Sequence, residues 1–179
     1  MGTGAHFGYR LTFATSLCAM HTTAMRLLPR TLVGTLLSLL ALCAQSQQSL
    51  SAKFDPQRDA VQDVAAATAS AKSAGKRVLV DVGGEWCKWC HILDRFIEAT
   101  PEVKAAIAAH YVTVKVNWSP ENKNQALLSR WPKIGGYPHL LVLDADGKLL
   151  QSQDTGVLES GEGYDKTKVL AFLTQYAVP

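Results

Sequence analysis

Two cysteines separated by two residues are the feature of this sequence best suited to chemistry. Cys87 and Cys90 follow an apolar run and a pair of glycines, in the segment Arg77-Val-Leu-Val-Asp-Val-Gly-Gly-Glu-Trp-Cys-Lys-Trp-Cys90. At this spacing the two thiols can close a small disulfide at the start of a helix. The other two cysteines, Cys18 and Cys43, lie in a leader that we expect to be removed. The mature chain would then hold one dithiol, a pattern that favours redox chemistry over structural cross-linking.

Residues 1–46 are expected to direct export. No acidic residue precedes Asp55, and a basic stretch beginning at Met25 is followed by the uncharged apolar run Thr31–Ala44. This order is typical of a secretory signal peptide, with Met25 as the true start and the residues before it as an upstream extension. The apolar run is shorter than the ~20 residues of a membrane-spanning helix, so we favour cleavage over a membrane anchor. Residues 47–58 are then predicted to be a short tether.

The remaining residues, 59–179, suit a single domain with one core. Once the leader and its arginines are removed, the positive and negative charges of residues 47–179 balance. The mature chain has no basic stripe, so nucleic acid and anionic membrane surfaces are not expected partners, and no integral membrane domain is expected. We expect a monomer, exported to the periplasm or secreted.

The sequence predicts an α/β domain in which helices alternate with strands. Helices are predicted at 59–74, 87–98, 100–110, 122–131 and 165–176, and strands at 78–82, 111–117, 140–144 and 148–152. Strands separated by helices pair in parallel, whereas the turn Ala145-Asp-Gly147 predicts an antiparallel hairpin. The expected architecture is a mixed central sheet with helices on both faces.

Four sequence features together resemble the thioredoxin superfamily over nearly all of the mature chain. Val80–Cys90 resembles the family's strand, buried acid and Trp-Cys-x-x-Cys turn, and Lys115 falls where thioredoxins carry a lysine near that acid. Gly135-Gly-Tyr-Pro138 resembles the cis-proline loop, and Gly156 with the final helix also fits the family pattern. Among relatives, the chain is most similar to exported thioredoxin-like domains and to the C-terminal domain of periplasmic reductant carriers. The resemblance implies a thioredoxin-like fold that works without metal or organic cofactor.

The resemblance also assigns roles to four catalytic candidates. Cys87, at a helix N-terminus, is expected to attack as a thiolate, because the helix dipole lowers the pKa of a thiol placed there. Cys90 would resolve the mixed disulfide, with Asp81 as the acceptor of its proton and Lys115 as a modulator of Asp81. The alternatives are an Asp81 bound by backbone groups in a turn and a Lys115 solvated at a strand end.

Four further residues are candidates for contact with a client protein. Trp86 is expected to shield the dithiol, and Tyr137 and Pro138 to form the cis-proline loop beside it. Trp89 is expected to be exposed between the cysteines, or partly buried against Trp131 or Tyr137. A trans proline in an ordinary loop is the alternative for Pro138.

The predicted function is an exported thiol–disulfide oxidoreductase acting on protein thiols and disulfides together with an unidentified redox partner. The reducing direction is favoured, because Asp81 and Lys115 match the reductase arrangement. An oxidase or isomerase, or a redox-inert binding module, are the alternatives.

Covalent haem attachment and zinc binding are two further alternatives. Cys87 to His91 matches the Cys-x-x-Cys-His haem motif, but the mature chain has no methionine to act as an axial ligand. A structural zinc site would need four ligands, and Cys87 and Cys90 with His91, His110 or His139 have a spacing that matches no zinc pattern. We therefore predict no metal ligand.

Overall fold

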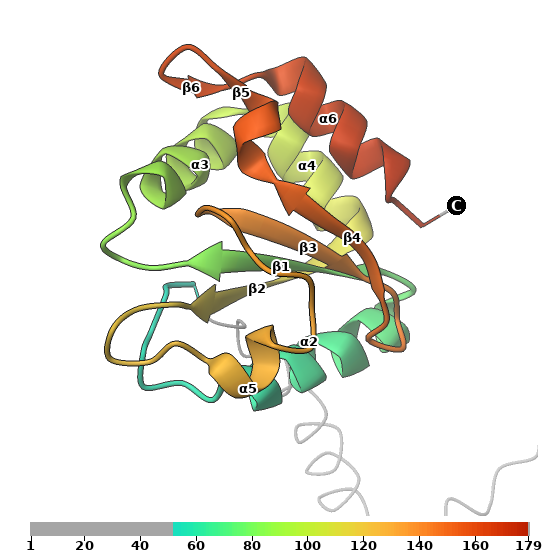
Figure 1. Cartoon of the computed structure of the whole chain (residues 1–179). Helices are drawn as coiled ribbons and strands as arrows, with labels where there is room; N and C mark the ends of the chain where they lie inside the picture. The colour runs from blue at the N-terminus through green and yellow to red at the C-terminus, as the bar shows by residue number, and fades with distance from the viewer. Residues whose placement is uncertain (1–51, 179) are drawn as a thin grey trace, which may run out of the picture. The chain divides into compact units, whose positions relative to one another are not determined.

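A mixed four-stranded sheet forms the centre of the molecule in the computed structural model, which describes residues 52–178 (Figure 1). Its strands are β1 Arg77–Gly83, β2 Tyr111–Asn117, β3 His139–Leu143 and β4 Leu149–Asp154. The strand order is β2-β1-β3-β4, with β1 parallel to β2, and β3 antiparallel to both β1 and β4. The predicted mixed sheet is therefore confirmed.

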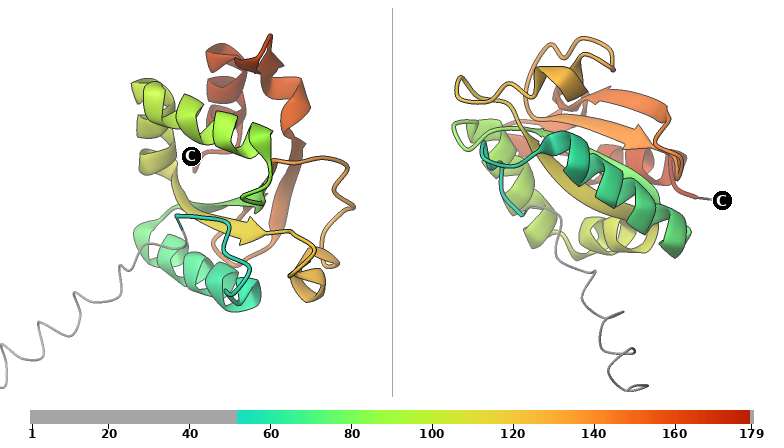
Figure 2. Two further views of the ribbon diagram at one scale, coloured as in Figure 1. Left: turned by 90° about the vertical axis from the view of Figure 1, so that its left-hand side faces the viewer. Right: turned by 90° about the horizontal axis from the view of Figure 1, so that it is seen from below.

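Helices cover both faces of this sheet. Their bounds are α2 Ala60–Ala74, α3 Lys88–Ala99, α4 Pro101–His110, α5 Gln125–Leu128 and α6 Lys166–Gln175. Helices α2 and α5 lie on one face, and α3, α4 and α6 lie on the other (Figures 1 and 2). The result is the expected three-layer α/β domain.

Strand β1 is buried on both faces because helices cover both sides of it. Val78, Val80 and Val82 pack into the core beneath α2, whereas Leu79 packs into the core beneath α3, α4 and α6. Side chains alternate along a strand, so Asp81 points to the same face as Leu79. The alternation therefore brings a carboxyl group beneath α3, the helix that carries Cys90.

Local sequence signals set most of the helix ends. The Asp59 side chain accepts hydrogen bonds from the backbone N–H groups of Val61 and Gln62 and so caps α2. Gly75 ends that helix at φ 63°, a left-handed conformation that glycine adopts readily. Pro101 begins α4 as predicted, although the side chain of Thr100 makes no capping hydrogen bond.

The helix predicted at 122–131 is wrong in extent, because only Gln125–Leu128 is helical. Two asparagine side chains in the loop before α5 bind backbone groups elsewhere: Asn122 Nδ2 donates to Pro56 O, which precedes α2, and Asn124 Nδ2 donates to Asn117 O at the end of β2. Asn124 itself has φ 45°. Side chains of this kind compete with helical hydrogen bonding, and here they hold the chain in a loop.

A short segment between β4 and α6 was not predicted from the sequence. It consists of a single 3₁₀ turn, Thr155–Leu158, and a two-stranded hairpin of β5 Glu159–Ser160 and β6 Gly163–Tyr164. Strands of two residues carry no readable alternation, so the pattern could not reveal them. The segment packs against the helical face of α3, through Tyr164.

The described part of the expected tether, residues 52–58, is packed against the domain instead of extending from it. Phe54 is 1% exposed, and the backbone of Pro56 is bound by Asn122. The left view of Figure 2 looks onto the end of the sheet where this segment passes. The signal peptide predicted at residues 1–46 lies outside the described residues. Between residues 52 and 178, none of the helices has the length and apolar character needed to cross a membrane.

Candidate active site

The two cysteines form a disulfide at the start of α3. Cys87 occupies the N-cap position and Cys90 the first turn, with their Cα atoms 5.2 Å apart. The Sγ atom of Cys87 accepts a hydrogen bond from the backbone N–H of Cys90 at 3.1 Å. Both residues are buried, Cys90 fully and Cys87 to 96%. Cys87, the residue expected to attack, is therefore slightly less buried than Cys90, and it lies where helix N–H groups stabilise negative charge.

The turn before the disulfide requires both of its glycines. A Cβ atom on Gly83 would collide with the Sγ atom of Cys90 and lie 3.0 Å from the ring of Phe54. A Cβ atom on Gly84 would collide with the indole of Trp86 and lie 2.9 Å from the carbonyl oxygen of Trp118. Gly83 is needed because β1 passes directly under Cys90, and Gly84 because the Trp86 indole and the Trp118 backbone fill the space beside it.

Asp81 and Lys115 are neighbours across the parallel strands β1 and β2. Lys115 Nζ donates to Asp81 Oδ2 at 3.0 Å and to Asp94 Oδ1 at 2.6 Å. Asp94 lies in α3, one turn beyond Cys90, and was not among the predicted site residues. The i+4 spacing from Cys90 to Asp94 places both on one face of the helix, a signal that could have identified it.

Burial and neighbouring charges shift the pKa values of Asp81 and Lys115. Burial raises the pKa of the Asp81 carboxyl, and the Lys115 ammonium offsets part of that rise. Burial disfavours the Lys115 ammonium, but the carboxylates of Asp81 and Asp94 outweigh this effect, so the pKa of Lys115 is raised. Asp81 Oδ1 is also buried without a hydrogen-bond partner among the described residues. The folded environment therefore favours the protonated form of Asp81, so its carboxylate is suited to accept a proton.

A cavity of about 430 Å³ connects this charged group with the surface. It is lined by Asp81, Asp94 and Lys115 and also by the exposed residues Glu98 and Lys104. The side chain of Asp94 is 38% exposed, compared with 13% for Asp81. Asp81 therefore lines the same cavity as groups that are exposed to solvent.

An aromatic cluster surrounds the other side of the dithiol. Trp86 is 54% exposed, and its ring meets those of Trp118 and Tyr137 edge-on, with centroids 5.9 and 5.8 Å apart. Trp118 and Tyr137 stack on each other at 5.1 Å. The peptide bond between Tyr137 and Pro138 is cis, as the resemblance implied. Trp118 was not predicted, because nothing in β2 marks the residue after it as a neighbour of Tyr137.

Trp89 lies partly buried between the cysteines instead of being exposed. Its ring contacts Tyr164 edge-on at 5.9 Å, and not Trp131 as one alternative held. It also packs against the cluster formed by Phe54, Cys87 and Cys90. The β5–β6 hairpin therefore covers Trp89 from the side, which the sequence could not indicate because the hairpin itself was not predicted.

Thr155 holds the cis-proline loop in place through a hydrogen bond. The hydroxyl of Thr155 donates to the carbonyl oxygen of Pro138 at 2.6 Å, and both residues are buried. Thr155 begins the 3₁₀ turn that follows β4. The unpredicted segment after β4 thus supports two parts of the site, Trp89 and Pro138.

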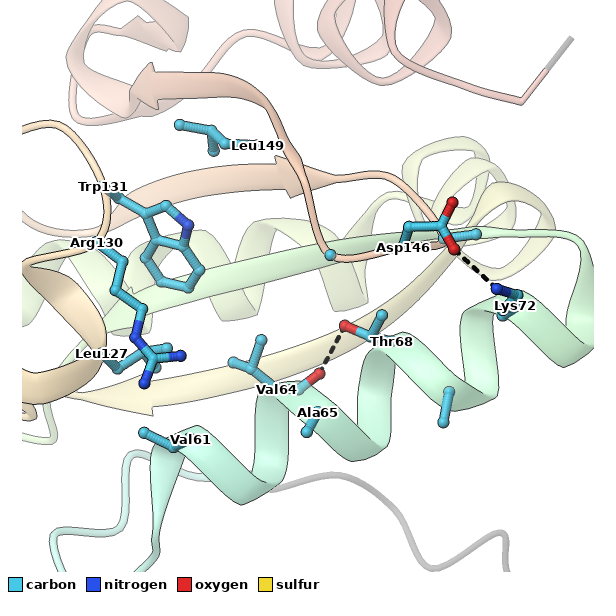
Figure 3. Close-up of a pocket in the computed structure, with 13 residues that line it drawn as sticks. Val61, Val64, Ala65, Thr68, Lys72, Leu127, Arg130, Trp131, Asp146 and Leu149 are labelled. Atoms are coloured by element: carbon cyan, nitrogen blue, oxygen red, sulfur yellow. Dashed lines mark hydrogen bonds and ion pairs between the residues drawn. The ribbon is translucent and has the colours of Figure 1, made fainter.

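A second hollow lies away from the dithiol, between α2, α5 and the β3–β4 turn (Figure 3). It has a volume of about 700 Å³, and Val61, Arg130, Trp131 and Asp146 line it. None of the predicted site residues reaches it. Across residues 52–178, no three His, Cys, Asp or Glu side chains are grouped so that they could hold a metal ion.

Comparison with known proteins relates this chain to a protein family. Residues 59–145 match a family model described as thioredoxin-like. The chain contains a thioredoxin-like domain. A solved structure, the disulphide isomerase from Xylella fastidiosa Temecula1, superposes with a TM-score of 0.60 at 27% identity, covering 68% of this chain and 94% of that one. The fold expected from the sequence is thereby confirmed.

Two curated proteins are similar in sequence. One is the disulfide bond reductase DsbH of Chlamydia pneumoniae, 33% identical over 76 residues, which are 38% of this chain and 45% of that protein. The other is the thiol:disulfide interchange protein DsbD of Actinobacillus pleuropneumoniae, 29% identical over 91 residues, which are 50% of this chain and 15% of that protein. The chain therefore spans less than half the length of either curated relative.

Proposed function

We propose that this protein is an exported thiol–disulfide oxidoreductase that reduces disulfides in protein clients through Cys87 and Cys90. The observation that carries the proposal is the position of the dithiol. Cys87 Sγ accepts the Cys90 N–H at the start of α3, above a buried Asp81 that is paired with Lys115. Such a site stabilises one thiolate and offers a proton acceptor for the other.

The first step is attack by the Cys87 thiolate on a client disulfide. A bond forms between Cys87 Sγ and one client sulfur, and the other client sulfur leaves as a thiolate. Because the helix N-terminus stabilises the Cys87 anion, we expect its pKa to lie below that of a free thiol, which is about 8.5. Lys88, the first residue of α3, adds a cation beside it.

The second step is resolution by Cys90. The Cys90 thiol gives its proton to the Asp81 carboxylate, and the resulting thiolate attacks Cys87 Sγ. The Cys87–Cys90 disulfide forms, and the second client sulfur leaves as a thiolate, so that two electrons have passed to the client. A thiol-bearing redox partner must then reduce the disulfide again, while Asp81 returns its proton along the cavity beside Asp94 and Lys115.

The client is expected to dock on the exposed aromatic cluster. Trp86 presents the largest exposed ring next to Cys87, and Tyr137 and Pro138 form the adjacent loop. Exposed tryptophan and tyrosine side chains are favoured anchors in protein interfaces. Trp89 is half-buried and contributes an edge of this surface.

Three arguments support direction and location. The buried Asp81–Lys115 pair matches a reductase arrangement, and one similar protein is named a disulfide bond reductase. The leader predicted at 1–46 supports export, which would place the dithiol in the oxidising periplasm or outside the cell. We propose that the protein acts there as a monomer.

The deciding experiment is the reduction potential of the Cys87–Cys90 couple, measured by thiol trapping after equilibration with glutathione. A value near about −270 mV, as for thioredoxin, supports a reductase, whereas about −120 mV indicates a dithiol oxidase. In parallel, Cys90→Ser should accumulate a mixed disulfide with clients through Cys87, and Cys87→Ser should not. The absence of any reversible two-electron transition would exclude the redox function.

An isomerase is the second candidate, because the similar structure from Xylella fastidiosa carries that description. An isomerase is expected at a potential near about −180 mV. It would restore activity to a scrambled disulfide protein without a net change in thiol count. A reductase would instead leave that substrate with free thiols.

A further inference from the structure

Phe54 lies directly against the resolving cysteine, although it precedes the matched thioredoxin-like segment. It is 1% exposed and packs in one cluster with Cys87 and Cys90. The ring is so close to Cys90 that a Cβ atom on Gly83 would touch both. Phe54 also lies beneath Lys115, whose Nζ is 4.1 Å from the ring centroid. One aromatic ring thus contacts both the resolving sulfur and the cation that pairs with the proton acceptor.

Two long-range hydrogen bonds hold the segment that carries this ring. The backbone N–H of Phe54 donates to Glu85 Oε1 at 2.9 Å, two residues before Cys87. Asn122 Nδ2 donates to the carbonyl oxygen of Pro56 at 2.9 Å from the loop after β2. Residues 52–58 form no strand or helix, so side-chain contacts such as these two bonds, the buried ring and the Arg58–Asp63 ion pair hold them in place.

The position of the ring determines how much water reaches Cys90. Cys90 is fully buried, and an apolar side chain covers the side on which β1 has only glycine. A thiol in apolar surroundings ionises less readily, because the thiolate loses its hydration. Excluding water also keeps outside disulfides away from Cys90, so that external exchange is confined to Cys87.

We propose that Phe54 is a positioning residue that seals Cys90 from solvent and so restricts Cys90 to the internal resolving step. This inference rests on the proposed function, in which Cys90 resolves and Cys87 attacks. It extends the active site to residues 52–58, outside the segment that the family comparison matches.

The test is the alkylation rate of Cys90 by iodoacetamide in a Cys87→Ser background. Mass spectrometry of the peptide that contains Cys90 excludes any signal from Cys18 and Cys43. With Phe54 present, Cys90 should react slowly, and Phe54→Ala should accelerate the reaction by at least about tenfold. The pH midpoint of the rate should also fall, because water admitted beside Cys90 stabilises its thiolate.

A graded series keeps the test valid if the alanine variant does not fold. Phe54→Leu fills most of the space and should change the rate by less than about threefold, with Phe54→Val between Leu and Ala. Leu143→Ala is the matched control, because Leu143 is fully buried at the far end of β3, where it pairs with Val78. It should destabilise the fold without exposing Cys90.

Two results would contradict the proposal that Phe54 seals Cys90 from solvent. One is a Cys90 rate and pH midpoint that do not change with the size of residue 54. The other is an equal acceleration by Leu143→Ala, which would assign the effect to general loss of stability. The outcome is separate from the proposed function: a protein with a normal redox transition but an insensitive Cys90 would keep its function and lose the seal.

Discussion

At the scale of single residues, the active site depends on one lysine placed between two carboxylates. Lys115 Nζ is within hydrogen-bond distance of both Asp81 and Asp94. Removal of Asp81 leaves the cation paired with Asp94, whereas removal of Lys115 leaves two acids without a cation. Burial of the Asp81 carboxylate costs more than its pairing with Lys115 returns, whereas removal of Lys115 leaves both acids without a cation, so these substitutions should have opposite effects on stability.

Asp81→Asn should raise the free energy of unfolding at neutral pH by about 1–3 kcal/mol, because it removes a buried carboxylate. The pKa of Asp81 is higher in the folded state than its ordinary value, so the folded state binds more protons than the unfolded state between those two values. The wild type therefore loses stability as pH rises through that window. Urea unfolding at several pH values should show the gain of the variant vanish below about pH 4. If the free energy of unfolding of the variant exceeded that of the wild type by the same amount at every pH, the gain would come from packing and not from the removed charge.

Lys115→Met should lower the free energy of unfolding at neutral pH by about 3 kcal/mol, because it leaves Asp81 buried beside Asp94 without a cation. The loss should shrink as pH falls, since Asp81 can then become protonated. In the wild type the contribution of Lys115 persists at neutral pH and is lost only as pH rises through its raised pKa. The double variant with Asp81→Asn should recover part of the loss, and failure to recover would refute the charge argument.

At the scale of elements, the segment between β4 and α6, which was not predicted, supports the Cys-x-x-Cys helix and the cis-proline loop, which were predicted. The Cys-x-x-Cys turn and the cis-proline loop were located from sequence, because their residue types are restricted by chemistry and backbone geometry. The 3₁₀ turn and the β5–β6 hairpin were not, because their strands are two residues long. The helix predicted at 122–131 is shorter than expected for a related reason, since asparagine side chains formed tertiary bonds that no local pattern encodes.

Thr155→Val should lower the free energy of unfolding by about 1–3 kcal/mol, because the buried carbonyl of Pro138 loses its donor while the volume stays the same. Thr155→Ser keeps the hydroxyl and should cost clearly less. Urea unfolding of both variants measures the difference. Equal losses would mean that the methyl group of Thr155, and not its hydrogen bond, supports the loop.

At the scale of the whole molecule, the folded unit begins earlier than the sequence indicated. We predicted a tether up to residue 58, and the family match also begins at residue 59. Polar residues and a proline hid the one apolar side chain, Phe54, that is packed into the site. The fold, both cysteines and the Asp81–Lys115 pair were predictable, because the resemblance to thioredoxins assigns these residues to definite places on the strands and the helix. Asp94, Trp118 and Phe54 depend on packing between distant segments.

A chain that begins at residue 59 should be less stable than one that begins at residue 47 by about 3 kcal/mol. It loses the burial of Phe54 and the hydrogen bonds to Glu85 and Asn122. Urea unfolding of the oxidised proteins compares the two chains directly. Equal midpoints at equal slopes would show that residues 47–58 contribute nothing to the fold.

The ring cluster of Trp86, Trp118 and Tyr137 also gives the molecule an optical property. Disulfides quench indole emission at short range, and Trp86 directly precedes Cys87 while its ring lies 5.9 Å from that of Trp118. Reduction of the Cys87–Cys90 disulfide should therefore increase the intensity of the protein's tryptophan fluorescence. Trp86→Phe should remove much of this change, whereas Trp131→Phe, which replaces an indole in the hollow away from the dithiol, should preserve it. The intensity of tryptophan fluorescence would then report the oxidation state of Cys87 and Cys90 without any added label.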